Sequence, residues 1–387
     1  MNTADAELWQ RVYSEFFPIS EYEPAEYQME VYPYDDGNYP DNIAEVWIAV
    51  RNKGNLKNTY NNRRVFILKE KVLILGGSYF VGRKIAIELS ESRYEVSILN
   101  RGTRSCPSEK IEQIICDRNN PEDMQRVLQN RAFDSIIDIS WQDIEWVKTL
   151  CTTVCFNSVK TFIFLSSSSV YDIEHLQVPF HEEDPLAPNK YWTLYSQGKI
   201  EAERYYEEFF REKDTQLVIL RPPYIYGEFN YAQREGFIFN HISEDKPVLI
   251  PKSNPKLQFI YSGDLADITR HLLENNKEKT VVYNVGNRIP VSSKEWVNLC
   301  SEIAGKPVQL IECDYNALGR NVRDFFPFFD YDNVLDVSKI NTIYTNEESL
   351  AEGLKKTYAW YLHNKEVINF NKNVEQNIYD IILDLNK

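Results

Sequence analysis

The spacing of apolar residues divides the chain into three regions. In the first, residues 1–66, Leu8, Val12 and Phe16 recur at helical spacing and predict a helix that Pro18 ends. Two strand-like runs follow, YQMEVYPY and AEVWIAVRN. The asparagine-rich stretch RNKGNLKNTYNNRR has no hydrophobic period and is predicted to be a linker. We therefore expect a short α+β appendage at the N-terminus.

From residue 67 onward, short apolar strands alternate with amphipathic segments. Six strands are predicted, at Lys71–Leu75, Glu95–Leu99, Gln113–Cys116, Ser135–Ile139, Thr161–Leu165 and Gln216–Leu220. Apolar strands separated by helices indicate a parallel sheet that is covered on both faces. The predicted fold class is α/β, a Rossmann-type doubly wound sheet whose nucleotide-binding core covers about residues 67–222. Residues 223–345, rich in Pro and Tyr, are expected to form a smaller C-terminal substrate lobe. Residues 364–387 are expected to be a polar, peripheral tail.

Composition narrows the classes of function. The 387 residues carry a formal charge of -15, which disfavours nucleic acid, because such binding depends on neutralising phosphates. No apolar run approaches the roughly 20 residues that span a bilayer, and the first residues lack the features of a signal peptide. The five histidines show no metal-binding spacing. We expect a cytoplasmic protein without a membrane segment or a metal site.

The stretch VLILGGSYFVG has the pattern of a phosphate-binding loop between a strand and a helix. Gly76 permits a tight turn, Gly82 allows the helix to pack closely on the sheet, and the N–H groups at the helix start suit a pyrophosphate. Tyr79 stands where such loops usually carry their middle glycine, and we expect it to pack beside the phosphates. The residues expected to bind the dinucleotide are Gly76, Gly77, Ser78, Tyr79, Phe80, Val81 and Gly82.

The second strand ends in Asn100, where an acidic residue would accept the ribose hydroxyls of NAD. Arg101 and Arg104 follow and suit a 2′-phosphate, so the cofactor is expected to be NADP or NAD, with NADP favoured. The alternative is that both arginines are solvated loop charges. Asp117, after the third strand, is placed either to meet the adenine or to cap the helix before Pro121.

The catalytic candidates lie on the next strand and helix. FIFL runs into four serines, and the following helix carries Tyr195 and Lys199 four residues apart, on one face. A lysine ammonium beside a phenol lowers the pKa of the phenol, and a serine hydroxyl can hold the substrate oxygen. With 25 tyrosines, a Y-x-x-x-K match is expected by chance. The order of glycine loop, serine-ended strand and Y-x-x-x-K is a stronger indication of nicotinamide-dependent chemistry on an alcohol or ketone.

Several motifs together resemble the extended short-chain dehydrogenases, the NAD-dependent epimerase/dehydratase family. They are LGGSYFVG, LSSSSVY, YSQGK, LRPPYIYG, QFIYSGDLADI, YNVGN and VLDVSKI, and the domain they define covers residues 67–363. The resemblance implies a catalytic Ser167 with Tyr195 and Lys199, and a Pro222 that lies along the nicotinamide. It also implies an NAD(P)-dependent oxidoreductase or epimerase that acts on a secondary alcohol or ketone, such as a nucleotide-sugar. The alternative is a nucleotide-sensing or RNA-binding relative without turnover.

Four further residues are candidates for the substrate site, namely Ser168, Tyr224, Arg234 and Arg288. The two arginines suggest an anionic group on the substrate, although each of the lobe residues would serve as well as a loop anchor. The expected partner is a small molecule, with a homodimer left open.

The N-terminal region carries a second resemblance. LWQRVYSEFF and AEVWIAV, within residues 7–51, are similar to the C-terminal half of gyrase-inhibitor-like effector-binding domains. The resemblance implies ligand contacts by Glu45 and Trp47. Because half a domain cannot form the whole pocket, a structural or dimer-forming appendage is favoured over ligand sensing.

Overall fold

The computed structural model describes residues 22–32, 45–52, 61–66, 69–140 and 143–385. The chain divides into two units, one of residues 1–71 and 89–95, the other of residues 72–88 and 96–387. The first unit contains an antiparallel sheet in the order β1-β2-β3. Its strands are β1 (Tyr22–Tyr32), β2 (Glu45–Asn52) and β3 (Asn61–Phe66).

β1 and β2 overlap the two strand-like runs of the sequence. β3 lies partly in the predicted linker, because pairing with β2 satisfies the hydrogen bonds of a segment that has no hydrophobic period. The helix predicted before Pro18 lies outside the described residues. The resemblance of this region to an effector-binding domain stays a prediction.

A seven-stranded parallel sheet forms the core of the second unit, in the order β14-β9-β8-β7-β4-β5-β6. Its strands are β4 (Glu70–Leu75), β5 (Tyr94–Asn100), β6 (Glu112–Ile115), β7 (Ser135–Asp138), β8 (Thr161–Leu165), β9 (Gln216–Arg221) and β14 (Thr280–Asn284). The six strands predicted from the sequence are confirmed. β14 was not predicted, because it joins the sheet next to β9 only after a long intervening segment that belongs to the lobe. The strand order reverses between β4 and β7, which is where open α/β sheets bind their ligands.

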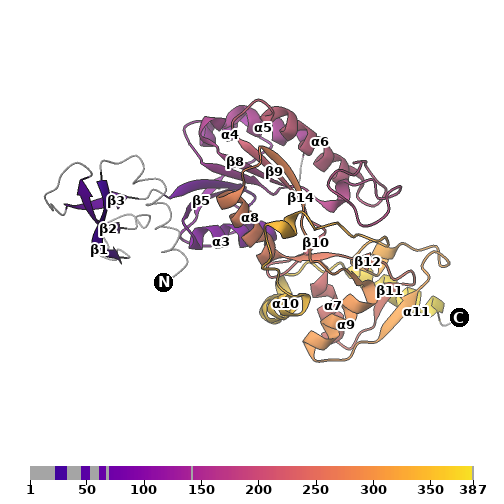
Figure 1. The fold of residues 1–387 in the computed structure, drawn as a ribbon. Coiled ribbons are helices and arrows are strands. Elements are labelled where there is room, and N and C mark those ends of the chain that lie inside the picture. The colour runs from indigo at the N-terminus through magenta and orange to yellow at the C-terminus, as the bar shows by residue number, and fades with distance from the viewer. Residues whose placement is uncertain (1–21, 33–44, 53–60, 67–68, 141–142, 386–387) are drawn as a thin grey trace. The chain divides into compact units, whose positions relative to one another are not determined.

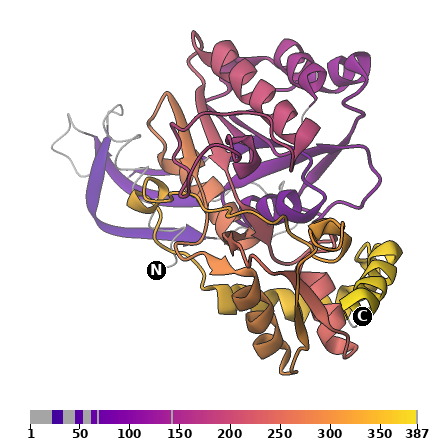
Figure 2. The ribbon, with the colours of Figure 1, turned by 90° about the vertical axis from the view of Figure 1, so that its right-hand side faces the viewer.

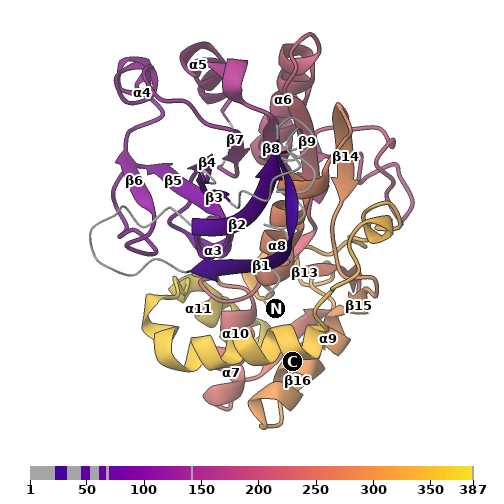
Figure 3. The same ribbon diagram turned by 60° about the vertical axis from the view of Figure 1, so that its left-hand side comes forward.

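Helices cover both faces of this sheet. They are α3 (Phe80–Glu91), α4 (Pro121–Leu128), α5 (Ile144–Thr153), α6 (Thr193–Phe210) and α8 (Ser262–Asn275). Figures 1 and 3 show α4, α5 and α6 on one face and α3 and α8 on the other. An ion pair of 3.5 Å joins Arg270 on α8 to Glu88 on α3. Because both faces are covered, residues 72–75 of β4 are wholly buried and apolar. The Rossmann-type fold is confirmed.

The smaller lobe follows β9. Its paired strands are β10 (Tyr224–Tyr226) with β13 (Phe259–Tyr261), β11 (Val248–Pro251) with β16 (Leu310–Cys313), and β12 (Lys256–Leu257) with β15 (Val291–Ser292). Its helices are α7 (Glu235–Ser243), α9 (Ser293–Ala304), α10 (Leu350–Asn364) and α11 (Lys372–Leu385). Phe259 and Trp296 stack in the lobe core with ring centroids 3.6 Å apart.

The C-terminal helix α11 differs from the peripheral tail expected for residues 364–387. It lies at the edge of the lobe (Figure 2), and its Val374, Ile378 and Ile381 are buried in the lobe core. Their spacing of three to four residues forms an apolar stripe that the polar composition of the segment conceals. No helix within the described parts of the chain is both long enough and apolar enough to cross a membrane.

Candidate active site

Two cavities open at the carboxyl ends of the central strands, and Gly76, Tyr79 and Ser140 line both of them. The first, of about 440 Å³, lies against the segments that follow β5 and β6. The second, of about 550 Å³, lies against the serines after β8, helix α6 and the start of the lobe. Because they meet at the glycine loop, together they offer room for the two halves of a dinucleotide.

The glycine loop has the shape that a pyrophosphate requires. Gly76 has φ +106°, which L side chains rarely adopt. A Cβ at Gly77 would lie 2.3 Å from Ile98 Cγ2, and one at Gly82 would lie 2.8 Å from the Gly76 carbonyl oxygen. Both positions therefore exclude a side chain. The loop leads directly into α3, whose first three residues, 80–82, line the second cavity, and the unpaired N–H groups of a helix start suit a phosphate.

The predicted loop residues divide between the two cavities. Gly76, Ser78 and Tyr79 line the first cavity, and Gly76, Tyr79, Phe80, Val81 and Gly82 line the second. Gly77 lines neither cavity, because it packs against Ile98 beneath the loop.

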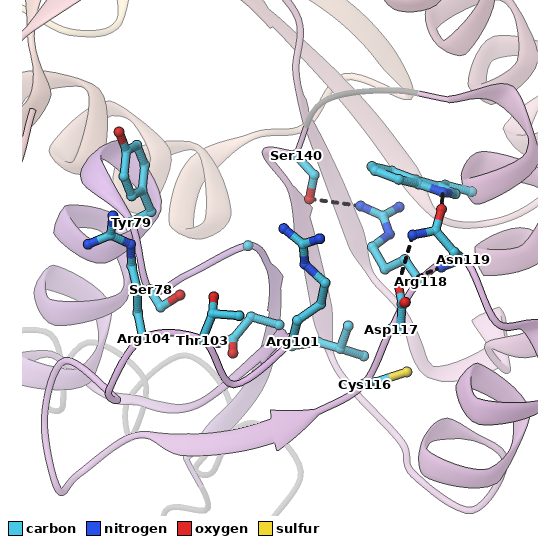
Figure 4. A pocket seen from close by; sticks show the side chains of 14 residues that line it. Ser78, Tyr79, Arg101, Thr103, Arg104, Cys116, Asp117, Arg118, Asn119 and Ser140 are labelled. Carbon is cyan, nitrogen blue, oxygen red and sulfur yellow. Dashed lines mark hydrogen bonds between the residues drawn. The ribbon is translucent and has the colours of Figure 1, made fainter. Parts of the chain in front are cut away.

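Asn100 and Arg101, at the end of β5 and just after it, line the first cavity. The Asn100 side-chain oxygen accepts hydrogen bonds from the Gly102 N–H at 2.8 Å and from Gln113 Nε2 at 2.9 Å. Its Nδ2 is buried without a hydrogen-bond partner among the described residues, and so is a free donor for a ribose oxygen or a phosphate. Figure 4 shows the Arg101 side chain extending into the middle of the cavity.

Arg104 and Asp117 line the same cavity but are already engaged with protein groups. The Arg104 guanidinium lies 4.7 Å from the ring centroid of Tyr79. Asp117 accepts hydrogen bonds from the backbone N–H and the side-chain amide of Asn119, at 3.0 and 2.9 Å. The cap of α4 is Asn120, which accepts the first N–H groups of that helix, so the capping alternative for Asp117 is wrong.

The sequence analysis missed a buried network at the base of this cavity. Arg118 pairs with Asp138 at 3.0 Å and donates to the Ser140 hydroxyl at 2.8 Å. Its guanidinium lies 5.4 Å from the ring of Trp146, whose indole N–H donates to Asn119 at 2.7 Å. Arg118 directly follows Asp117, and Asp138 lies within the fourth predicted strand, so this pair had a signal in the sequence. Trp146 had none.

The second cavity brings together Ser167, Tyr195 and Lys199. The Ser167 hydroxyl lies near enough to the Tyr195 phenol to lower its pKa against the effect of burial. The Lys199 ammonium donates to the carbonyl oxygens of Leu165 at 2.7 Å and Ser140 at 3.0 Å, and it lies 5.9 Å from the ring centroid of Tyr195. Ser167, which follows β8, thus meets Tyr195 and Lys199 of α6 beside the glycine loop.

Burial dominates the electrostatics of this group. It lowers the pKa of Lys199 to about 8, although the carboxylates of Asp138 and Glu203 favour the charged ammonium. Burial also raises the pKa of Tyr195, against the opposing influence of the Ser167 hydroxyl and of the Arg234 charge. The expectation that Lys199 lowers the pKa of Tyr195 is therefore corrected. Desolvation outweighs the nearby charges, and Tyr195 is a protonated phenol at neutral pH.

A buried ion pair fixes helix α6, which carries both Tyr195 and Lys199. Arg221 at the end of β9 contacts Glu203 on α6 at 2.6 Å, and both side chains are almost fully buried. Removing either partner would leave an uncompensated buried charge, so the pair resists sliding of α6 along the sheet. This contact therefore helps to fix where Tyr195 and Lys199 lie on the sheet.

Three of the four substrate candidates, Ser168, Tyr224 and Arg234, line the second cavity together with Pro222. Arg288 does not, because its side chain pairs with Glu347 at 3.4 Å and its backbone N–H donates to the same carboxylate. Trp192 and Asn333 line this cavity and were missed in the sequence. Within the described ranges, no cluster of three or more His, Cys, Asp or Glu residues could hold a metal ion.

Comparisons with known proteins identify the family to which the chain belongs. The model of the NAD dependent epimerase/dehydratase family matches residues 72–286. The chloroplast stem-loop binding protein of 41 kDa b from Arabidopsis thaliana is 25% identical over 308 residues, which cover 75% of this chain and 79% of that protein. A putative UDP-glucose 4-epimerase from Methanocaldococcus jannaschii is 23% identical over 317 residues, 76% of this chain and 99% of the relative.

Solved structures share the fold. A UDP-N-acetylglucosamine 4-epimerase from Methanobrevibacter ruminantium M1, in complex with UDP-N-acetylmuramic acid, has a TM-score of 0.64 at 19% identity and covers 77% of this chain and 100% of its own. A dTDP-glucose 4,6-dehydratase from Bacillus anthracis in complex with NAD also has a TM-score of 0.64, at 18% identity, and covers 77% of this chain and 98% of its own.

Proposed function

Because the chain belongs to the NAD-dependent epimerase/dehydratase family, we propose that its second cavity oxidises, reduces or epimerises a secondary alcohol or ketone. The observation that carries this proposal is the meeting of Ser167, Tyr195 and Lys199 beside the glycine loop. A bound nicotinamide would supply the hydride acceptor or donor for the carbinol carbon. The remaining steps belong to side chains of this chain.

Tyr195 is the proposed acid and base. Because burial keeps its phenol protonated, Tyr195 gives a proton to a ketone oxygen as hydride reaches the carbon. In the oxidising direction Tyr195 first loses its proton to solvent, and the phenolate then takes the proton of the alcohol as hydride leaves the carbon. Ser167, which lines the same cavity as Tyr195, holds the reacting oxygen. An epimerase would run both directions on opposite faces of one carbon.

We propose that the Lys199 ammonium supplies a positive charge close to Tyr195 during the reaction. Its ammonium is anchored on two backbone carbonyl groups, so its position does not depend on the substrate. With a pKa lowered to about 8, it carries its charge at neutral pH. The same anchoring leaves it a remaining donor for a ribose hydroxyl of the cofactor.

Arg234 supports a substrate that carries an anionic group, such as a nucleotide-sugar. It lines the second cavity, where it donates to the Ile225 carbonyl at 3.2 Å and lies 5.8 Å from the ring of Tyr224. Both contacts are with uncharged groups, so they leave its positive charge available for a phosphate or a carboxylate. Trp192 adds an aromatic face on which a sugar ring can pack.

The cofactor is of the NAD type, and we further propose a preference for NADP. Asn100 supplies no carboxylate to repel a 2′-phosphate, and its Nδ2 is a free donor. Arg101 extends into the cavity where that phosphate would lie (Figure 4). Of the two arginines expected there, Arg101 supports the preference, whereas Arg104 is stacked on Tyr79.

The competing proposal is an RNA-binding or nucleotide-sensing protein without turnover. It is favoured by the similarity to a protein named for stem-loop binding, and opposed by the formal charge of -15. Two assays of the purified chain separate the proposals. We expect turnover of NADPH or NADH with a panel of ketones and nucleotide-sugars, and no salt-sensitive retention of stem-loop RNA. Retention of RNA, with tight cofactor binding but no turnover, would favour the competitor.

A further inference from the structure

Three side chains from distant segments meet beside the glycine loop. Tyr79 comes from the loop itself, Arg104 from the segment after β5, and Tyr231 from the lobe segment between β10 and α7. The Arg104 guanidinium lies 4.7 Å from the ring centroid of Tyr79 and 4.5 Å from that of Tyr231. The two rings are 4.9 Å apart. Each member therefore touches the other two, and we call this group the clasp.

The clasp stands where the two cavities meet. Tyr79 lines both of them, and it immediately precedes α3, whose first N–H groups suit the pyrophosphate. Figure 4 shows Tyr79 and Arg104 side by side at one end of the first cavity. Tyr231 lines neither cavity. Two members of the clasp can thus contact a bound dinucleotide, and the third acts only through them.

Both ends of the clasp are anchored in the protein. On the nucleotide side, the Arg104 carbonyl oxygen accepts a hydrogen bond from Gln113 Nε2 on β6 at 2.9 Å. On the lobe side, the Tyr231 carbonyl oxygen accepts the Asn369 N–H at 3.0 Å, and its ring meets Trp360 on α10 edge-on, with centroids 5.7 Å apart. The clasp therefore joins two anchored parts of the unit across the glycine loop.

The lobe segment that holds Tyr231 is itself rigidly folded. The Glu235 carboxyl oxygen accepts hydrogen bonds from the Gly227 N–H at 3.2 Å and from the Asn230 side chain at 2.9 Å. Phe229 adopts a φ of +64°, a left-handed conformation that costs free energy in a residue other than glycine and persists only where its surroundings impose it. Tyr231 is consequently held in place without help from a ligand.

We propose that Tyr79, Arg104 and Tyr231 retain the dinucleotide, so that a lobe residue outside the cofactor cavities sets its rate of dissociation. This inference rests on the proposed dinucleotide site. A pyrophosphate held at the start of α3 would lie next to Tyr79, and its release would require the Tyr79 ring to leave Arg104 and Tyr231. The clasp also accounts for a bulky ring where such loops usually carry glycine, since a glycine there would have no face for the guanidinium.

The test measures dissociation of NADPH, and of NADH in parallel, from the full-length chain. The complex is mixed with excess oxidised cofactor, and the fluorescence of the reduced nicotinamide is followed with time. Tyr231→Ala, Tyr79→Leu and the double variant are compared with wild type. Tyr379→Ala is the matched control, because Tyr379 is a 59% exposed tyrosine on α11. Thermal unfolding of each variant verifies that it is folded.

We expect each single variant to release the cofactor roughly 2- to 30-fold faster, the range of a partly to fully desolvated cation–π contact. The double variant should gain less than the product of the two single effects, because both remove one shared contact. Arg104→Lys, which keeps the charge but loses the planar face, should also speed release.

If Tyr231→Ala and Tyr79→Leu released the cofactor as slowly as wild type and Tyr379→Ala do, the proposed role of the clasp would be wrong. The proposed function would be unaffected by that result. A wild-type chain that binds neither NADPH nor NADH would overturn both. Multiplicative effects of the two tyrosine substitutions would also contradict the clasp, because independent contacts give independent changes.

Discussion

Gly82 lies where α3 passes closest to the segment after β7, and replacing it with alanine probes the glycine loop directly. The new Cβ would lie 2.2 Å from Ile139 Cδ1, 2.8 Å from the Gly76 carbonyl oxygen and 3.1 Å from Gly77 Cα. The isoleucine methyl group can rotate away. The two backbone atoms cannot, so the turn that faces the pyrophosphate must shift.

The expected cost to stability is small. Overpacking of this kind costs about 1–3 kcal/mol, and the higher helix propensity of alanine returns about 1 kcal/mol. The net loss of about 0–2 kcal/mol should lower Tm by a few degrees at most. Affinity for the dinucleotide should fall at least about tenfold, equivalent to about 1.4 kcal/mol, because the N–H groups no longer converge on the phosphates.

Calorimetric titration with NADPH and NADH measures the loss of affinity, and a thermal unfolding curve measures the loss of stability. Gly305→Ala is the matched control. Gly305 has φ +64° and caps α9, but a Cβ there meets no atom within 4 Å. Gly305→Ala should lower the free energy of unfolding by about 1 kcal/mol through backbone strain alone, and it should leave the affinity for the dinucleotide unchanged. If Gly82→Ala bound dinucleotide as tightly as Gly305→Ala does, the assignment of this loop would be refuted.

Three further substitutions give distinct outcomes. Burial raises the pKa of Asp264 to about 7, so the wild type should lose stability from about pH 4, where the unfolded carboxyl ionises, to about pH 7. Asp264→Asn should lack that loss, and a Tm difference that is constant over this pH range would contradict it. Arg118→Met leaves Asp138 buried without its ion pair and should cost about 3–5 kcal/mol in denaturant unfolding; a loss under about 1 kcal/mol would argue against the pair. Arg101→Ala should weaken NADPH binding roughly tenfold and leave NADH binding unchanged, since only NADPH carries the 2′-phosphate; equal weakening would refute the preference.

The sequence reveals the nucleotide core because its strands are buried on both faces. Each of the six predicted strands is a short, mainly apolar run, and such a run is visible in the sequence without knowledge of the side-chain packing. β14 escapes prediction, because its partner β9 lies some sixty residues earlier in the chain and no local pattern indicates that it rejoins the sheet. The buried stripe of α11 is hidden in the same way, by polar residues on its outer face.

The site residues that belong to backbone motifs could be predicted from the sequence. The partners of individual side chains could not, because tertiary contacts determine them. The glycine spacing and the serine–tyrosine–lysine order anticipate which residues line the cavities. Burial decided the direction of the Tyr195 pKa shift, and burial is a property of the folded chain. Arg288 has a charge that would suit an anionic substrate. In the folded chain its side chain instead forms an ion pair with Glu347, which is distant in sequence. Arg104 likewise stacks on Tyr79 and Tyr231, a contact that only the folded lobe creates.

The central claim is that Tyr195 moves the proton while a nicotinamide carries the hydride. A single-turnover experiment tests it most directly, by mixing the NADPH or NADH complex with each ketone or nucleotide-sugar that the wild type converts and following the nicotinamide absorbance. We predict that Tyr195→Phe, which removes only the phenol oxygen, slows this change by about 100-fold or more, with cofactor affinity within about twofold of wild type. Hydride transfer at the wild-type rate in Tyr195→Phe would contradict the account.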